Sequence, residues 1–467
     1  MRTPQQSDPA VLEFGERFLE FLIAAEIVSR GTGPAKFLGE NDFQNVLIFD
    51  SFVQKEDELP DIWRDSGIVS ARLLAKTPKS ERHSKFEHDY ASIRREVWNR
   101  FSNLYDLAYQ AADRIKDPLV KEIRISELES VKANYELAGF TLGLSQSTPL
   151  FMQSQLVITG DYHVETEDSL DRLAAELSDK LSRRGFPGNS LQEQMLGMEA
   201  STYLRIERVV PEYKTLIEKL RTVTTQMLGI DDNDFRVIVK ALPESENKTG
   251  SFEFEGNGRA VTSIRESRTT TKARIAYVSA HEMVHGMQHL LIERYFNRTG
   301  DRFAAAGTMC TSSVMFLEGE ADMGYIIYRP VVMQVLNNDA ELLDIVDIVV
   351  TADRLKKATI HYTCRLGYQR LFHEHADPEE VFREMEAIHL KYGMDKESAT
   401  KLARGIVNED ILNKIMFYRP FYGVANRVVE RIFSRFPTFE DAMIAYRRVS
   451  SEIGPITLNA ASKILVP

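Results

Sequence analysis

The feature that most restricts how this chain can fold is an H-E-x-x-H motif inside an apolar, helix-like segment, residues 273–296 (ARIAYVSAHEMVHGMQHLLIERYF). Apolar residues flank the motif at helical spacing, which predicts a buried α-helix. Residues four apart share one face of such a helix, so the imidazoles of His281 and His285 can reach the same ion. Burying these polar side chains costs free energy unless they are satisfied. The segment therefore predicts a metal site on a buried helix.

Glu282 lies one step round the helix from His281, which turns its carboxylate toward a water molecule on an open coordination position of the metal. Zinc lowers the pKa of such a water toward about 7, and a carboxylate can then take its proton. We therefore expect His281 and His285 to bind one Zn²⁺ per chain and Glu282 to be the general base. His289 continues the same helix face, and we expect it to have a structural or supporting role.

A catalytic zinc site needs a third protein ligand and keeps one position for water. A second helical pattern, residues 312–328, is apolar apart from Glu318, Glu320 and Asp322. The intervening chain is long enough for a turn and an antiparallel return. Glu318 and Glu320 lie about 200° apart on an α-helix, so an undistorted helix cannot turn both toward one metal. Both remain candidates on spacing alone.

The pairing of H-E-x-x-H with an E-G-x-A sequence that begins at Glu318 resembles the glutamate-zincin metallopeptidases, whose third ligand is a glutamate on a second helix. The E-x-x-x-D pattern that ends at Asp322 is similar to that of the thermolysin-like members. The resemblance covers residues 272–329 and implies that Glu318 is the ligand. It also implies that Asp322 accepts a hydrogen bond from a ligand imidazole. Glu320 would then be solvated or would contact a substrate amine.

An aromatic segment, residues 417–424, offers candidates for other roles. Peptide hydrolysis at zinc builds an oxyanion, which a Tyr or His beside the metal usually stabilises. Two tyrosines four apart and a following Gly resemble the segment that closes the site in mostly helical metallopeptidases. Tyr422 is thus the first candidate and Tyr418 the second. Arg419 is a candidate partner for a substrate carboxylate. Packing in a core is the alternative role for the aromatic residues.

Three strand patterns lie directly before the motif helix, at residues 235–242, 250–255 and 258–266. They predict a small antiparallel or mixed sheet within residues 235–266. Glutamate-zincins lay their substrate along an edge strand at this place, so the resemblance makes residues 258–266 the candidate edge strand.

Helical periodicity dominates the rest of the chain, so we expect a predominantly α-helical α+β protein. Residues 145–163 are richer in Ser, Thr and Gly and predict irregular structure or a short strand. We expect a mostly helical N-terminal region at residues 1–230 and a catalytic region at residues 231–467, which ends in a helical part. The other expected helices span residues 10–30, 80–144, 166–184 and 190–228.

The composition limits the classes of partner that we expect for the protein and the cellular compartment in which we expect it. A formal net charge of −11 disfavours a broad nucleic-acid surface, which needs clustered Lys and Arg. The two cysteines, Cys310 and Cys364, are too few for a disulfide framework. No segment has the roughly 20 apolar residues of a membrane span. We therefore expect a soluble cytoplasmic protein that binds neither nucleic acid nor membranes.

Together these features predict a zinc metallopeptidase that hydrolyses peptide bonds in a peptide or protein substrate, as a carboxypeptidase or an oligopeptidase. Two alternatives stay open: a pseudoenzyme that binds zinc for structure, and a metal-free helical interaction scaffold. The intact Glu282 favours an enzyme. A purely structural zinc site more often has its coordination closed by four protein ligands, frequently Cys.

Overall fold

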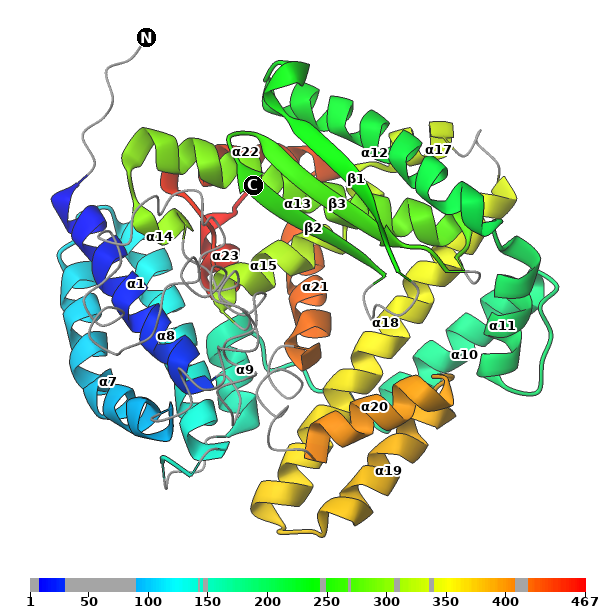
Figure 1. The fold of residues 1–467 in the computed structure, drawn as a ribbon, viewed down its shortest axis with the longest axis horizontal. Helices are drawn as coiled ribbons and strands as arrows, with labels where there is room; N and C mark the ends of the chain where they lie inside the picture. The colour runs from blue at the N-terminus through cyan, green and yellow to red at the C-terminus, as the bar shows by residue number, and fades with distance from the viewer. Residues whose placement is uncertain are drawn as a thin grey trace, which may run out of the picture. The chain divides into compact units, whose positions relative to one another are not determined.

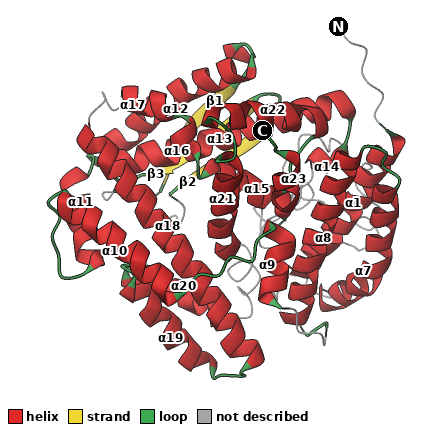
Figure 2. Ribbon diagram, turned by 180° about the vertical axis from the view of Figure 1, so that it is seen from behind, coloured by secondary structure: helices red, strands yellow, loops and turns green. Residues whose placement is uncertain are grey.

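The protein combines many helices with one small sheet, which confirms the predicted fold class, a predominantly helical α+β protein (Figures 1 and 2). None of the helices in the described ranges is long and apolar enough to cross a membrane. The computed structural model describes residues 8–29, 90–141, 143–145, 150–243, 249–267, 270–305, 311–335, 340–407 and 419–467.

The chain divides into two compact units, neither of which is one continuous stretch. Unit 1 comprises the described parts of Met1–Tyr162, Leu291–Phe316 and Asn408–Pro467. Its core packs Phe14 and Phe18 against Phe303. Its helices are α1 (Pro9–Ser29), α7 (Tyr90–Asp113), α8 (Pro118–Thr141), α9 (Phe151–Thr159), α14 (Arg302–Ala305), α21 (Arg419–Phe433), α22 (Phe439–Ile453) and α23 (Leu458–Ile464).

Unit 2 comprises the described parts of His163–Leu290 and Leu317–Val407, so the predicted division at residue 230 falls inside it. Two helices are shared: α13 (Lys272–Thr299) passes into unit 1 at Leu291, and α15 (Ser312–Ala321) enters unit 2 at Leu317. The other helices of unit 2 are α10 (Glu167–Arg183), α11 (Leu191–Thr202), α12 (Ile206–Leu228), η3 (Asp232–Asp234), α16 (Gly324–Ile327), α17 (Arg329–Val335), α18 (Ala340–Tyr368), η4 (Gln369–His373), α19 (Pro378–Lys391) and α20 (Lys396–Val407).

The sheet is mixed, with the strand order β1-β3-β2. β1 (Arg236–Leu242) runs parallel to β3 (Arg259–Arg265), and β2 (Gly250–Gly256) runs antiparallel to β3. The mixed sheet before the motif helix is as predicted, but the choice of residues 258–266 as an edge strand was wrong. A tight turn joins β2 to β3, and β1 takes the other side of β3, which is therefore central. β1 and β2 are the edges.

One face of the sheet carries both α12 and α13 (Figures 1 and 2). Phe252 of β2 is paired with Thr262 of β3, so their side chains point to the same face. The Thr262 hydroxyl bonds to that of Tyr213 on α12 at 2.5 Å, and the Phe252 ring stacks on His289 of α13. The sheet and the motif helix thus pack directly on each other.

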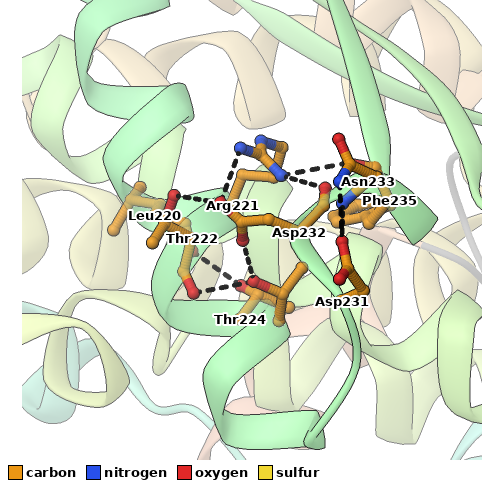
Figure 3. A network of polar contacts seen from close by, with 9 residues as sticks. Leu220, Arg221, Thr222, Thr224, Asp231, Asp232, Asn233 and Phe235 are labelled. Atoms are coloured by element: carbon orange, nitrogen blue, oxygen red, sulfur yellow. Dashed lines mark hydrogen bonds and ion pairs between the residues drawn. The ribbon is translucent and has the colours of Figure 1, made fainter.

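The turn between α12 and β1 is fixed by polar contacts of Arg221 and Asp232 (Figure 3). The Arg221 guanidinium donates to the carbonyl oxygens of Asp232, at 2.6 Å, and of Phe235, at 3.2 Å. The Asp232 carboxylate accepts from the hydroxyls of Thr222 and Thr225. These contacts fix the turn through which the chain passes from α12 into β1.

Two long predicted helices are interrupted, each for a local reason. The prediction over residues 190–228 becomes α11 and α12, because Leu204 N–H donates to Thr270 O at 3.0 Å and pulls the chain out of the helix. The prediction over residues 80–144 becomes α7 and α8. Asp117 begins the second of these by capping it, accepting from Leu119 N–H at 2.8 Å, and residues 80–89 lie outside the described ranges.

Within residues 145–163, residues 151–159 form α9 where irregular structure or a short strand was predicted, and irregular structure follows at residues 160–163; residues 146–149 lie outside the described ranges. Buried residues of α9 include Phe151, Gln155 and Ile158, which share one helical face despite the polar composition. Gly160 ends the helix in the left-handed conformation, with φ of 72°.

Candidate metal centre

The motif histidines lie on α13, which matches the predicted helix 273–296. The second predicted helix, residues 312–328, is interrupted: α15 ends at Ala321 and α16 starts at Gly324 after a two-residue turn. Gly324 explains the break. A side chain there would place its Cβ 2.5 Å from Ala280 O and 2.9 Å from His281 N, so only glycine lets this segment reach α13.

The structure brings together His281, His285 and Glu318. Glu318 Oε2 lies 3.7 Å from His281 Nε2 and 3.5 Å from His285 Nε2. Donors on a tetrahedral zinc with bonds of about 2.1 Å are separated by about 3.4 Å, so this donor set fits zinc. Within the described ranges no other group of three His, Cys, Asp or Glu side chains comes together in this way. The three side chains are 14–16% exposed, which leaves the centre accessible from solvent.

His281 presents Nε2 to the centre because its other ring nitrogen faces a carboxylate. Asp322 Oδ1 lies 3.2 Å from His281 Nδ1, the place that the resemblance implied for it. This oxygen is buried and no described group donates a hydrogen bond to it, so it remains available to His281 Nδ1. A proton on Nδ1 is therefore favoured, and Nε2 keeps the lone pair that a metal needs.

His285 is oriented by a neutral amide, that of Gln288. The Gln288 Nε2 donates to Leu317 O and to Glu320 Oε2, both at 2.8 Å. Its Oε1 therefore faces His285 Nδ1, at 2.9 Å, and can only accept. This fixes the proton on Nδ1 and leaves His285 Nε2 for the metal. Gln288 was not predicted, although its place three residues after His285 on the same helix face is a usable signal.

Glu320 is fully buried, so its prediction as a solvated residue or a substrate contact was wrong. The helical geometry correctly placed it away from the face that carries Glu318. However, that side of α15 packs against α13, where the amide of Gln288 donates to Glu320. Its role is to hold an amide that orients a histidine.

The electrostatics of the centre favour a cation. Burial lowers the pKa of His285, but the charges of Glu318 and Glu282 and the hydrogen bonds to Glu318 and Gln288 outweigh it and raise this pKa to about 9. The next histidine along the helix behaves oppositely. Burial, assisted by the charge of His285, lowers the pKa of His289 to about 3, and its ring stacks on Phe254. His289 is therefore a neutral packing residue.

Glu282 is 8% exposed and lies against the start of β2. A side chain at Gly250 would place its Cβ 3.0 Å from Glu282 Oε1 and 2.6 Å from Val278 Cγ1. Glycine thus allows the backbone of an edge strand to approach the carboxylate directly. Behind it, burial and the charge of Glu282 raise the pKa of Tyr213 well above its usual value, so this phenol is neutral. Sequence reasoning did not single out Tyr213.

A second polar group extends behind Asp322. The Lys357 ammonium donates to Asp322 Oδ2 at 2.5 Å and lies 2.7 Å from Asp353 Oδ2. Burial lowers the pKa of Lys357, but the charges of both carboxylates outweigh it and raise this pKa above its usual value. The Tyr277 hydroxyl donates to Asp353 Oδ2 at 2.9 Å. None of these three supporting residues was predicted: Lys357 and Asp353 come from a helix, α18, that the motif does not mark, and Tyr277 lies on α13 outside the motif itself.

The structure does not test the roles of the remaining predicted residues. Tyr418 and Cys310 are outside the described ranges. Tyr422 lies in α21 of unit 1, and Arg419 is the first residue of that helix, with a side chain outside the described part. Their roles stay predictions. Cys364 is a buried free thiol.

No family model matches the sequence, and no curated protein matches it. Among solved structures, the chain is similar to "the putative lipoprotein from Colwellia psychrerythraea", with 12% sequence identity and a TM-score of 0.47, over 80% of this chain and 69% of that one. A likeness this distant says nothing about activity, so the chemistry follows from the residues of the centre alone.

Proposed function

We propose that this protein is a zinc-dependent metallopeptidase in which His281, His285 and Glu318 hold one Zn²⁺ and Glu282 is the general base. The convergence of two imidazole Nε2 atoms on one carboxylate oxygen supports this most strongly, because each imidazole has its other nitrogen engaged. Such a pattern prepares both rings to give a lone pair to one ion.

When bound, zinc would supply Lewis acidity, which polarises the scissile carbonyl and acidifies water. Glu282 takes a proton from the attacking water as its oxygen bonds to the carbonyl carbon. The carboxyl group then delivers that proton to the leaving nitrogen as the C–N bond breaks. The low exposure of Glu282 limits competing bulk water, and the close approach of Gly250 fixes where the carboxylate lies.

The position of β2 supports a peptide as the substrate. In the part of the chain that the structure describes, β2 pairs with β3 alone, and its first residue, Gly250, lies so near Glu282 that a Cβ there would be 3.0 Å from Oε1. An extended peptide can add to such an edge through main-chain hydrogen bonds, which recognise any sequence. The scissile bond of a peptide held there would lie near the base. The choice between a carboxypeptidase and an oligopeptidase depends on Arg419 and stays a prediction.

Two alternatives differ in their observable consequences. A zinc-binding pseudoenzyme would hold metal without turnover, whereas an interaction scaffold would hold no metal. Three donors with solvent access favour an enzyme over a structural site, which usually closes its coordination with a fourth protein ligand.

The test is metal analysis combined with peptidase assays on a library of quenched fluorescent peptides. We expect stoichiometric zinc, chelator-sensitive cleavage, and a loss of about 10²–10⁴-fold in kcat for Glu282→Gln with zinc retained. Glu218→Gln, at an exposed position of α12, is the matched control and should resemble the wild type. Bound zinc without cleavage of any peptide would indicate the pseudoenzyme. An absence of zinc after supplementation would indicate the scaffold.

A further inference from the structure

We propose that Lys357 is a positioning residue of the metal centre, which holds the Asp322 carboxylate in the orientation that faces His281 Nδ1. This inference rests on the proposed zinc site. Lys357 is on α18 and donates to Asp322, so it would act on His281 through that carboxylate.

The two oxygens of Asp322 have different partners. Oδ2 accepts from Lys357 Nζ at 2.5 Å, and Oδ1 lies 3.2 Å from His281 Nδ1. A carboxylate can rotate about its bond to Cβ, so fixing one oxygen determines where the other lies. Asp322 is only 3% exposed, and few waters can replace the lysine as a donor.

Lys357 is itself held in place from α13. Its second partner, Asp353, lies one turn earlier on α18, with oxygen and nitrogen 2.7 Å apart. The same Asp353 oxygen accepts from Tyr277, which precedes His281 by four residues and so shares its helix face. The chain of contacts leaves α13 at Tyr277 and returns to it at His281. It therefore aligns α18 and the turn after α15 with the helix that carries the metal ligands.

Stability alone does not explain a lysine at this position. Charges removed from water lose hydration, and apolar residues of similar volume often stabilise a fold as well or better. Lys180 offers a comparison inside unit 2, since it also lies between two carboxylates, those of Glu176 and Asp347, each at 2.9 Å. Both of these carboxylates are largely exposed, at 52% and 60%, unlike the buried Asp322. Lys180 thus has the same ionic pattern without the link to a histidine.

The experiment measures zinc affinity by competition with a chromophoric chelator. Lys357→Met should weaken zinc binding by about tenfold, at the lower end of what losing an outer partner of a metal ligand costs. Lys180→Met should bind zinc as the wild type does. Lys357→Arg should recover part of the loss, because it restores a cationic donor to Asp322. The visible spectrum of the Co²⁺-substituted Lys357→Met protein should also change, since it reports ligand geometry.

A double-mutant cycle separates positioning from general destabilisation. If Lys357 acts through Asp322, adding Lys357→Met to Asp322→Asn should weaken zinc binding no further than Asp322→Asn alone. Additive losses, or unchanged affinity and Co²⁺ spectrum in Lys357→Met, would overturn the inference and leave the proposed function standing. Wild-type protein that binds no zinc would overturn both. If Lys357→Met does not fold, the zinc affinities of Lys357→Gln and Lys357→Arg are compared instead. Equal affinities of these two variants would contradict a positioning role for Lys357.

Discussion

The regions around His281 and His285 reach the same result by different chemistry. His281 faces a carboxylate, Asp322, which is anchored by a lysine. His285 donates to a neutral amide, Gln288, whose own nitrogen is held by a carboxylate and a main-chain carbonyl. Both arrangements direct Nε2 toward Glu318.

The difference shows that orientation and charge are separable properties of a supporting group. An amide can fix the tautomer of a ring but adds little to its basicity, whereas a carboxylate does both. We therefore expect the ionic region around His281 to contribute more to metal affinity than the neutral region around His285, although both rings are equally placed.

The largest effect should come from removing either ring. His281→Ala and His285→Ala each delete one of three donors, so each protein should lose its zinc on dialysis, measured by atomic emission against the stoichiometric wild type. Equal losses would show that both regions serve one ion. Full zinc retention in either variant would remove that histidine from the centre.

Substitution of the two supporting residues, Asp322 and Gln288, should show how much each region contributes to zinc affinity. Asp322→Asn should weaken zinc binding by about 10–100-fold, and Gln288→Leu should weaken it less, nearer to about tenfold. Chelator competition on both variants gives the ratio of their zinc dissociation constants. A greater loss for Gln288→Leu would reverse the comparison and make the amide the more important support.

The close approach at Gly324 should matter for stability. Gly324→Ala places a methyl group 2.5 Å from Ala280 O, an overpacking that should lower the free energy of unfolding by about 1–3 kcal/mol. Gly197→Ala in α11 meets nothing within 4 Å and should be neutral or stabilising by about 0.4–1 kcal/mol. Urea unfolding of both variants without metal tests the pair. Equal stabilities would mean that the segment can move away from α13.

The pH dependence should reflect the carboxylates around His285, above all that of Glu318. Its pKa is raised from 6.5 to about 9 in the folded, metal-free protein. The bound proton therefore stabilises that form fully below pH 6.5, and this stabilisation is lost as the pH rises through 9. Zinc displaces the proton, so binding at pH 7.5 should release about one proton, measured by calorimetry in buffers of different ionisation enthalpy. Release near zero would contradict the raised pKa.

Sequence patterns predicted what depends on local periodicity. The motif helix, the three strands and the pairing of His281 with His285 follow from spacing within single segments, whereas Glu318 was chosen over Glu320 through the family resemblance. What failed depends on contacts between segments. The breaks near Leu204 and at Asp322–Met323 arise from Thr270 O and from the backbone at Ala280, which periodicity cannot reveal.

The supports of the centre were missed for the same reason. Lys357 lies 35 residues after Asp322, on a helix whose register against α13 has no signature in the sequence. Glu320 was assigned to solvent because it points away from the metal. When other elements pack on more than one side of a helix, a residue that faces away from the proposed site can still be buried, as Glu320 is.

The division of the chain into discontinuous units has a consequence for synthesis on the ribosome. All residues of unit 2, the proposed zinc ligands included, are available once Val407 has been made. Unit 1 begins with α1, α7 and α8, yet its core includes Ala460 and Ile464. The core of unit 1 is therefore complete only after Ile464 has been made, later than every residue of unit 2.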